Sequence, residues 1–362
     1  MKNDLYYVSY LNNWGSGITK KIESQISEFE NCGFNVRYIT LAKRINKILK
    51  YLYKCVPFLS EYNYSKIGDI SKSCVYIRYS KLDFRGLIAL RQLKKNGNSI
   101  ICEIPTYPYD GEMIGIDKVL MYKDHIWRHY LAKYVDRIAT YSNDSYIYNV
   151  PCLNISNFVD SHNIMASHRI NNTNLQINMI AVASLAFWHG YDRILKGLYE
   201  YYQSHPIINV DFYLVGDGRE IDKYKNYIHN KNLESHVHIL GSLTGEKLKQ
   251  IYDVADIAID TLGRHRSDIY YNSTLKGKEY LAKGLPIVSG VETELDHMRD
   301  FPFYLRVPAD DSPIDIYDII AFFNKVNSIT DYHEKIRAVA EDCFNAKVCL
   351  KPIIDYFKGQ KE

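Results

Sequence analysis

Short apolar runs alternate with longer amphipathic stretches along the whole chain. The apolar runs have the length of β-strands, and the stretches between them repeat apolar residues at helical spacing. Strands that alternate with helices pair in parallel, because each connection crosses back over the sheet. The sequence therefore predicts an α/β protein built on parallel sheets.

The alternation forms two series, which the polar, Asn-rich stretch 157–174 separates. The first series predicts helices at 18–31, 84–95 and 118–133, and strands at 5–10, 35–40, 74–79, 99–104, 137–141 and 152–155. The second predicts strands at 177–184, 210–215, 236–240, 257–260 and 286–289, with helical patterns at 314–327 and 332–357 closing the chain. A length of 362 residues suits two domains of this kind. We therefore predict two Rossmann-like domains facing each other across a cleft, over 1–160 and 161–340, and a C-terminal helix in 341–362 that returns to the first domain.

Composition narrows the classes of function. An apolar content of 46% with 24% charged residues is typical of a packed globular protein, and a net charge of +3 is too small to indicate nucleic-acid binding. The seven cysteines include no CxxC pair, which favours a reduced compartment and predicts no metal site. The first residues lack the apolar stretch of a signal peptide. These features together predict a cytoplasmic protein.

The segment 271–288 reads as a loop, a helix beginning near Thr274, a glycine stop and a buried strand. Free N–H groups at such a helix start bind phosphate, so we expect the backbone around Ser273 and Leu275 to hold a diphosphate. Lys276 or Lys278 would add positive charge. Glu279, one turn further on, is placed to accept hydrogen bonds from two ribose hydroxyls. An isolated glutamate at a helix start is more often simply solvated, so the surrounding pattern matters.

That pattern resembles the donor-site signature of family-four glycosyltransferases, in which a glutamate precedes Ala-x-Gly-x-Pro-x-Val, as Glu279 does here. The likeness extends to Gly216 after a strand and to a turn ending in Leu243. It implies the GT-B fold and a retaining, metal-independent transfer of a sugar from a nucleotide-diphosphate sugar, most commonly a UDP-sugar, without a cofactor. It also implies that Leu243 packs near the base, that the backbone of Thr274 and Leu275 holds phosphate, and that Glu279 binds ribose.

Two positions depart from the family pattern. The earlier of the family's two glutamates, which contacts the transferred sugar, corresponds to Tyr271, and the family's Lys-Gly position reads His189-Gly190. A departing diphosphate needs positive charge to stabilise it. We assign this task to His189 and Arg193, with Arg264 and Arg266 as further cations in the donor site. The departures leave a catalytically inactive GT-B binding partner as an alternative, and a sugar-nucleotide epimerase of the same fold as another.

The first domain carries two further candidate segments. The strand 99–104 runs into a polar aromatic loop that resembles the acceptor-side loops of bacterial capsule and exopolysaccharide transferases. A rim of aromatic residues there would stack on a sugar, with Asp110 acting in catalysis and an acceptor site made of Glu103, Thr106, Tyr107 and Tyr109. An ordinary loop would have the same composition. The glycine turn formed by Gly15, Ser16 and Gly17 is expected to close against the diphosphate.

The segment 41–58 interleaves five basic residues with Ile, Leu and Tyr at helical spacing. Such a helix suits an anionic membrane surface, although a half-buried helix with a basic outer face has the same pattern. We expect this segment to dock the first domain on the inner face of the membrane, where a glycan or polyprenyl-linked acceptor would lie.

Overall fold

The computed structural model describes residues 4–10, 17–43, 45–56, 58–113, 115, 118, 121–167 and 175–359. The chain divides into two compact units. The N-terminal unit comprises residues 1–156 together with 346–362, and the C-terminal unit comprises residues 157–345.

The N-terminal unit is built on a seven-stranded sheet with the order β2-β1-β3-β4-β5-β7-β6. All of its pairings are parallel except that of β6 with β7. The central strands are continuous apolar runs with helices against both faces, as a buried parallel sheet requires. The strands are β1 (Asp4–Ser9), β2 (Asn35–Thr40), β3 (Cys74–Arg78), β4 (Ser99–Ile104), β5 (Arg137–Thr140), β6 (Tyr146–Ile147) and β7 (Val150–Asn154).

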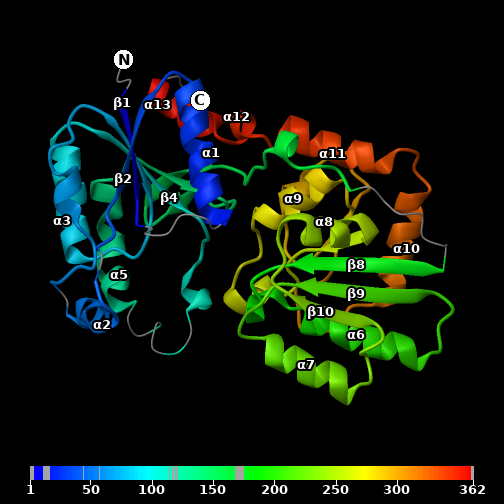
Figure 1. Ribbon diagram of the computed structural model, residues 1–362. Helices are drawn as coiled ribbons and strands as arrows, with labels where there is room; N and C mark the ends of the chain where they lie inside the picture. Colours follow the sequence, from blue (N-terminus) through cyan, green and yellow to red (C-terminus); the bar gives the residue numbers. More distant parts are fainter. Residues whose placement is uncertain are drawn as a thin grey trace. The chain divides into compact units, whose positions relative to one another are not determined.

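Helices cover both faces of this sheet (Figure 1). The α2, α3 and α5 helices lie together on one side, and α1 lies with α13 on the other. Asp83 caps α3 by accepting a hydrogen bond from the Gly86 N–H, at 2.8 Å. The helices are α1 (Gly17–Asn31), α2 (Lys47–Cys55), α3 (Phe84–Lys95), α5 (Tyr122–Trp127), α12 (Ala346–Cys349) and α13 (Lys351–Lys358), with 3₁₀ turns η1 (Tyr64–Ile67), η2 (Asp110–Glu112) and η3 (Arg128–Lys133).

The C-terminal unit has a six-stranded parallel sheet with the order β10-β9-β8-β11-β12-β13. The strand order reverses beside β8, so β8 and β11 flank the point where ligands bind in open sheets of this type. The strands are β8 (Gln176–Val182), β9 (Asn209–Val215), β10 (Val237–Gly241), β11 (Ile257–Ile259), β12 (Ile287–Ser289) and β13 (Tyr304–Arg306).

The reversal also determines which face of the sheet each helix covers. Right-handed crossovers place helices on one face where successive strands are added in one direction, and on the other face where they are added in the opposite direction. Figure 1 shows α6 and α7 on one side of β8, β9 and β10, with α8 and α9 on the other. The helices are α6 (Asp192–Gln203), α7 (Ile221–Asn230), α8 (Gly245–Val254), α9 (Leu275–Lys283), α10 (Ile316–Asn327) and α11 (Tyr332–Cys343), with 3₁₀ turns η4 (Ser161–Asn163), η5 (Phe187–His189), η6 (Arg264–Ser267) and η7 (Glu294–His297).

Three predicted helices differ from the structure. The pattern 118–133 becomes the short α5 followed by η3, and 332–357 breaks into α11, α12 and α13. The last break precedes Pro352, which lies in the first turn of α13, where its missing N–H costs nothing. Among the described residues of 41–58, the helix spans Lys47–Cys55. Across the described residues no helix combines the length and apolar character needed to cross a bilayer.

Candidate functional site

Three loops at the carboxyl edge of the six-stranded sheet pack backbone against backbone. A Cβ on Gly190 would lie 2.5 Å from the Gly263 nitrogen, and a Cβ on Gly216 would lie 1.8 Å from the Ala183 carbonyl oxygen. The Leu262 N–H donates to the His189 carbonyl at 2.8 Å. The loops after β8, β9 and β11 are therefore held at fixed positions around the edge.

The start of α9 faces the end of β11. Thr274 caps the helix, accepting a hydrogen bond from the Gly277 N–H, and its hydroxyl donates to Oδ2 of Asp260 at 2.5 Å. Asp260 directly follows β11 and is 1% exposed. The first N–H groups of a helix have no acceptor within the helix, and the helix dipole adds partial positive charge there. The helix begins where the sequence predicts, and its start offers hydrogen-bond donors to an anion.

Lys276, in the first turn of α9, is the cation nearest this carboxylate. Its Nζ lies 3.5 Å from Oδ1 of Asp260 and donates to the Tyr191 hydroxyl at 3.0 Å. Burial lowers the pKa of Lys276 to about 8, and the repulsion of Arg264 adds to this effect, while Asp260 opposes both. A bound anion would favour the charged form. Lys276 is thus poised to gain from the arrival of a phosphate.

His189 is neutral in this site. Burial lowers its pKa to about 2, and the charges of Lys276 and Arg264 act in the same direction. Its Nδ1 accepts a hydrogen bond from the Ala186 N–H at 3.1 Å, so the proton of the neutral ring belongs on Nε2. The expectation that His189 acts as a cation is therefore wrong, but the ring retains one N–H donor.

Arg264 lies in η6, after β11, with its guanidinium 5.8 Å from the Trp188 ring centroid. Because its charge is felt by both His189 and Lys276, these three side chains form one electrostatic cluster. The cluster contains two cations, one neutral imidazole and the buried Asp260 carboxylate. It therefore has the net positive charge that a diphosphate requires.

Glu279 lies one turn further along α9, where it accepts a hydrogen bond from the Tyr252 hydroxyl at 3.2 Å. Its side chain is only partly buried. A carboxylate can accept about four hydrogen bonds, so the contact with Tyr252 leaves capacity for a ligand. Of the other two lysines of this helix, Lys278 is 1% exposed and pairs with Glu294 at 2.7 Å, and Lys283 lies in the last turn, with its Nζ 5.0 Å from the Tyr252 ring centroid. Lys276 is therefore the lysine at the helix start.

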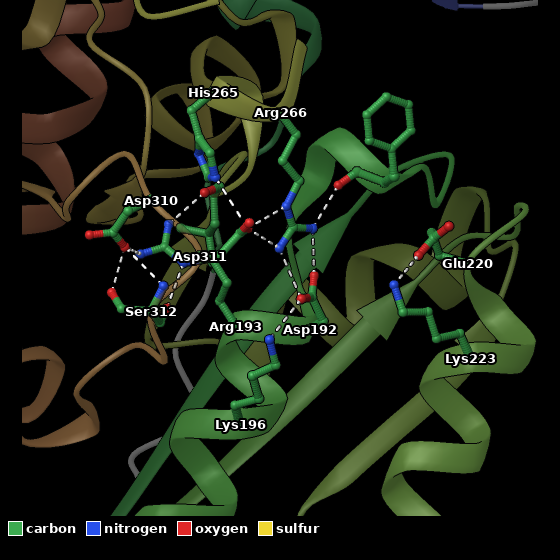
Figure 2. A network of polar contacts seen from close by, with 12 residues as sticks. Asp192, Arg193, Lys196, Glu220, Lys223, His265, Arg266, Asp310, Asp311 and Ser312 are labelled. Atoms are coloured by element: carbon green, nitrogen blue, oxygen red, sulfur yellow. Dashed lines mark hydrogen bonds and ion pairs between the residues drawn. The ribbon is translucent and has the colours of Figure 1, made fainter. Parts of the chain in front are cut away.

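Arg193 and Arg266 are structural, contrary to the sequence-based expectation (Figure 2). Arg193 is fully buried, and its guanidinium donates to the carbonyls of Leu262 and Ser312 at 2.6 and 2.8 Å. Arg266 makes a bidentate pair with Asp192, at 2.8 and 2.9 Å. These contacts fasten the loop after β11 to α6 and to the segment before α10. They also engage guanidinium N–H groups that would otherwise bind a diphosphate.

The remaining residues of the predicted donor site have varied surroundings. Tyr271 forms a parallel bridge with Glu292 and stacks on His297. Ser273 accepts a hydrogen bond from the Asn157 N–H at 2.8 Å, so its hydroxyl holds the segment that begins this unit. Leu243 follows β10 and is partly exposed, Leu275 opens α9 and is exposed, and Gly17 opens α1, whereas Gly15 and Ser16 lie outside the described residues.

In the N-terminal unit, a pocket of about 230 Å³ lies at the carboxyl ends of β3 and β4. Thr106 and Tyr109 line it, together with Tyr79. The Tyr79 and Tyr109 hydroxyls both donate to the buried Asp124, each at 2.6 Å, which fixes the two rings. Tyr107 packs instead against Tyr148, with ring centroids 5.7 Å apart. Two of the four predicted acceptor residues thus line one pocket.

Glu103 is not available to a ligand, because it is completely buried. The hydroxyls of Tyr76 and Tyr141 donate to it at 3.0 and 2.8 Å, and Arg78 donates at 2.7 Å. Burial raises its pKa, but Arg78 and Lys21 outweigh this and hold the pKa at about 2. The predicted role of Glu103 in binding hydroxyls is therefore wrong, and the residue anchors the core beneath this edge of the sheet.

Asp110 is held in a bidentate pair by Arg128, at 2.8 and 2.9 Å. The hydrogen bond from Arg128 lowers the pKa of this carboxyl. Arg128 thus fixes the orientation of this carboxylate, whose side chain is 42% exposed, and its catalytic role stays a prediction. Among the described residues, no three His, Cys, Asp or Glu side chains are arranged to hold a metal ion.

Comparison with solved structures identifies the fold of the chain. No family model and no curated protein sequence matches the chain. Solved structures do match: a glycosyltransferase from Rickettsia africae has a TM-score of 0.66 at 12% identity, over 99% of this chain and 98% of that one. The chain adopts the GT-B fold. Sucrose-phosphate synthase from Thermosynechococcus elongatus gives a TM-score of 0.69 at 12% identity, covering 99% of each chain. HepE of Anabaena, solved in complex with UDP, gives a TM-score of 0.63 at 12% identity, over 99% and 100%.

Within this GT-B fold, sequence reasoning missed Asp260, Tyr191 and Tyr252 as members of the site. Asp260 carried a usable signal, since it is a carboxylate directly after a buried strand. Tyr191 and Tyr252 carried no such signal, because the sequence does not distinguish a tyrosine that packs in the core from a tyrosine that lies beside a ligand.

Proposed function

We propose that this protein transfers a sugar from a nucleotide-diphosphate sugar to a glycan or lipid-linked saccharide. The observation that carries the proposal is the start of α9, where a Thr274-capped helix end, Lys276 and Glu279 lie within two turns beside the switch point of the sheet. This arrangement offers N–H donors and a cation to a diphosphate, and a carboxylate to ribose hydroxyls.

In the proposed reaction, the bond between the anomeric carbon and the diphosphate oxygen breaks, and the acceptor hydroxyl oxygen forms the new bond on the same face of the sugar. The acceptor proton passes to the departing phosphate. Negative charge grows on the diphosphate, and Lys276, Arg264 and the Nε2–H of His189 would stabilise it. Since the chain itself supplies this positive charge, we propose that no metal ion is required. Activity that withstands EDTA and a product anomer matching the donor, seen by NMR, would support both features.

Uridine is the proposed base. HepE has been solved with UDP and with UDP-glucose, and the shared fold makes the same donor class the first to test. Leu243, in the turn after β10, is proposed to pack near the base, and Glu279 to hold the ribose.

The proposed acceptor site is the pocket lined by Thr106 and Tyr109. Its mixture of aromatic faces and hydroxyl groups suits a saccharide, because sugars present both apolar faces and hydroxyls. A lipid-linked saccharide would lie at the inner face of the cytoplasmic membrane, which is where we propose the protein works.

The test is calorimetric titration of UDP, GDP and ADP, each alone and as common sugar conjugates, into the full chain and into Glu279→Gln. Glu246→Gln is the matched control, since Glu246 is an exposed glutamate in the first turn of α8, in the same unit. We expect one nucleotide to bind the full chain and the control equally, and the Glu279 variant at least tenfold more weakly. Absence of binding by every nucleotide would overturn the proposal and favour a catalytically inactive GT-B partner.

A further inference from the structure

A second cavity, of about 690 Å³, lies in the N-terminal unit, outside the candidate sites described above. It is a groove between α3 and residues 58–68, on the side of the sheet where α2, α3 and α5 lie (Figure 1). Its volume falls within the range of roughly 300–1,000 Å³ that is typical of ligand pockets. Its apolar lining comes mainly from Phe58, Tyr64, Phe84 and Ile88.

Exposed apolar side chains lie both in the groove and on α2, which ends at Cys55, shortly before Phe58 in the chain. Phe58 is 61% and Ile88 51% exposed, and on α2 Ile48 is 81% and Leu52 50% exposed. Single exposed apolar residues are ordinary, but several of them in a groove and on the preceding helix indicate a surface that contacts something apolar.

The charge of this surface is one-sided. Among the described residues that line the groove, Lys43 and Arg85 are cationic and none is a carboxylate. Arg85 donates from Nε to the Phe58 carbonyl at 3.0 Å, so its charge is fixed at the mouth. An apolar groove with a cationic rim is complementary to an amphiphile with an anionic head group.

We propose that this face docks on an anionic lipid bilayer and that the groove receives one acyl chain. Ile48, Leu52 and Phe58 enter the interface, while Lys43 and Arg85 contact lipid phosphates at the mouth of the groove. The inference concerns this surface alone and needs no nucleotide, so it stands or falls independently of the proposed transfer reaction.

The binding test is co-sedimentation of the full chain with vesicles of neutral phosphatidylcholine, and with vesicles containing phosphatidylserine. We expect binding to the anionic vesicles only, reduced about tenfold or more in Ile88→Asp and in Phe58→Asp. Ile207→Asp is the matched control, because Ile207 is 85% exposed in the C-terminal unit. Absence of binding, equal binding to neutral vesicles, or equal loss in the control would overturn the docking proposal.

The groove itself is tested with Trp127, whose ring lies 5.1 Å from that of Phe84. The chain has three tryptophans, so Trp14→Phe and Trp188→Phe leave Trp127 as the reporter. Lipids with brominated acyl chains should quench its fluorescence strongly, and Ile88→Asp should abolish the quenching. Membrane binding without quenching would overturn the acyl-chain part. The circular dichroism spectrum and melting temperature of the Ile88 variant, expected to match those of the full chain, check that it is folded.

Discussion

The Nζ atom of Lys276 lies 3.5 Å from Oδ1 of Asp260, and both side chains are largely shielded from water. The pair joins the first turn of α9 to the end of β11, the two elements that frame the candidate donor site. Burial alone would favour the neutral form of Lys276, and the attraction of Asp260 opposes this. The pKa of Lys276 nevertheless falls to about 8, because burial outweighs the attraction.

Affinity for UDP should therefore depend on pH through Lys276. In the protein without ligand, Lys276 loses its proton as the pH rises through about 8. A bound diphosphate favours the charged form, so UDP binding should weaken above that pH. Lys276→Arg keeps its charge and should show a flatter profile between pH 7 and 9. Lys276→Met should bind UDP roughly 10–100-fold more weakly. Calorimetric titration across this pH range measures both effects.

Lys276→Met also leaves Asp260 buried without its cation, so lost stability must be separated from lost binding. The double variant Lys276→Met/Asp260→Asn removes both charges and should recover much of the melting temperature, but none of the UDP affinity. Recovery of affinity in the double variant would show that Lys276 does not contact the ligand.

The buried, neutral His189 should make the protein sensitive to acid. Its folded pKa of about 2 lies far below the ordinary value near 6.5, so the unfolded chain binds a proton that the folded chain does not. Stability is complete above pH 6.5 and falls as the pH drops below it, by about 1.4 kcal/mol per pH unit from this group. His189→Asn keeps an acceptor for the Ala186 N–H but cannot titrate.

Melting temperatures of the full chain and of His189→Asn should thus converge as the pH falls from 7 to 5. Curves that remain parallel over this range would indicate that His189 titrates normally in the folded protein.

The central strands of the sheets could be predicted because they are buried on both faces. The predicted strand 99–104 is β4, whose continuous apolar run is typical of a buried strand. The short strands β6 and β13 were not predicted. β13 has two partly exposed residues and one exposed residue at the edge of its sheet, and so carries too little pattern to stand out.

The candidate site was less predictable, because burial of charge depends on distant partners. Arg193 and Arg264 look equivalent in sequence. Only the fold brings the carbonyl of Ser312, 119 residues away, onto the Arg193 guanidinium. The helix start near Thr274 could be predicted, since a cap and a following glycine stop are local signals.

Replacing Arg193 should damage stability and not ligand binding. Arg193→Met leaves the Leu262 and Ser312 carbonyls without their donor and should cost about 3–5 kcal/mol of unfolding free energy. Arg299→Met, at an exposed position of the same unit, should change it by less than about 0.5 kcal/mol. Denaturant unfolding measures both. If Arg193→Met is fully stable but fails to bind UDP, Arg193 belongs to the ligand site after all.

Gly216 and Gly241 lie at the ends of neighbouring strands, and substituting them distinguishes the cost of an unusual backbone conformation from the cost of a steric clash. Gly216 has a φ of +131°, and its added Cβ would lie 1.8 Å from the Ala183 carbonyl oxygen, whereas Gly241 has a φ of +66° with no atom within 4 Å of such a Cβ. Gly241→Ala therefore bears only the cost of a left-handed residue, about 1–2 kcal/mol.

Gly216→Ala must in addition push the loop after β9 away from the loop after β8. We expect it to unfold the C-terminal unit or to lower its melting temperature far more than Gly241→Ala does, with loss of UDP binding. Differential scanning calorimetry resolves the two effects. Equal, small shifts for the two variants would mean that these loops are not packed against each other, and that the rigid edge inferred for the donor site does not exist.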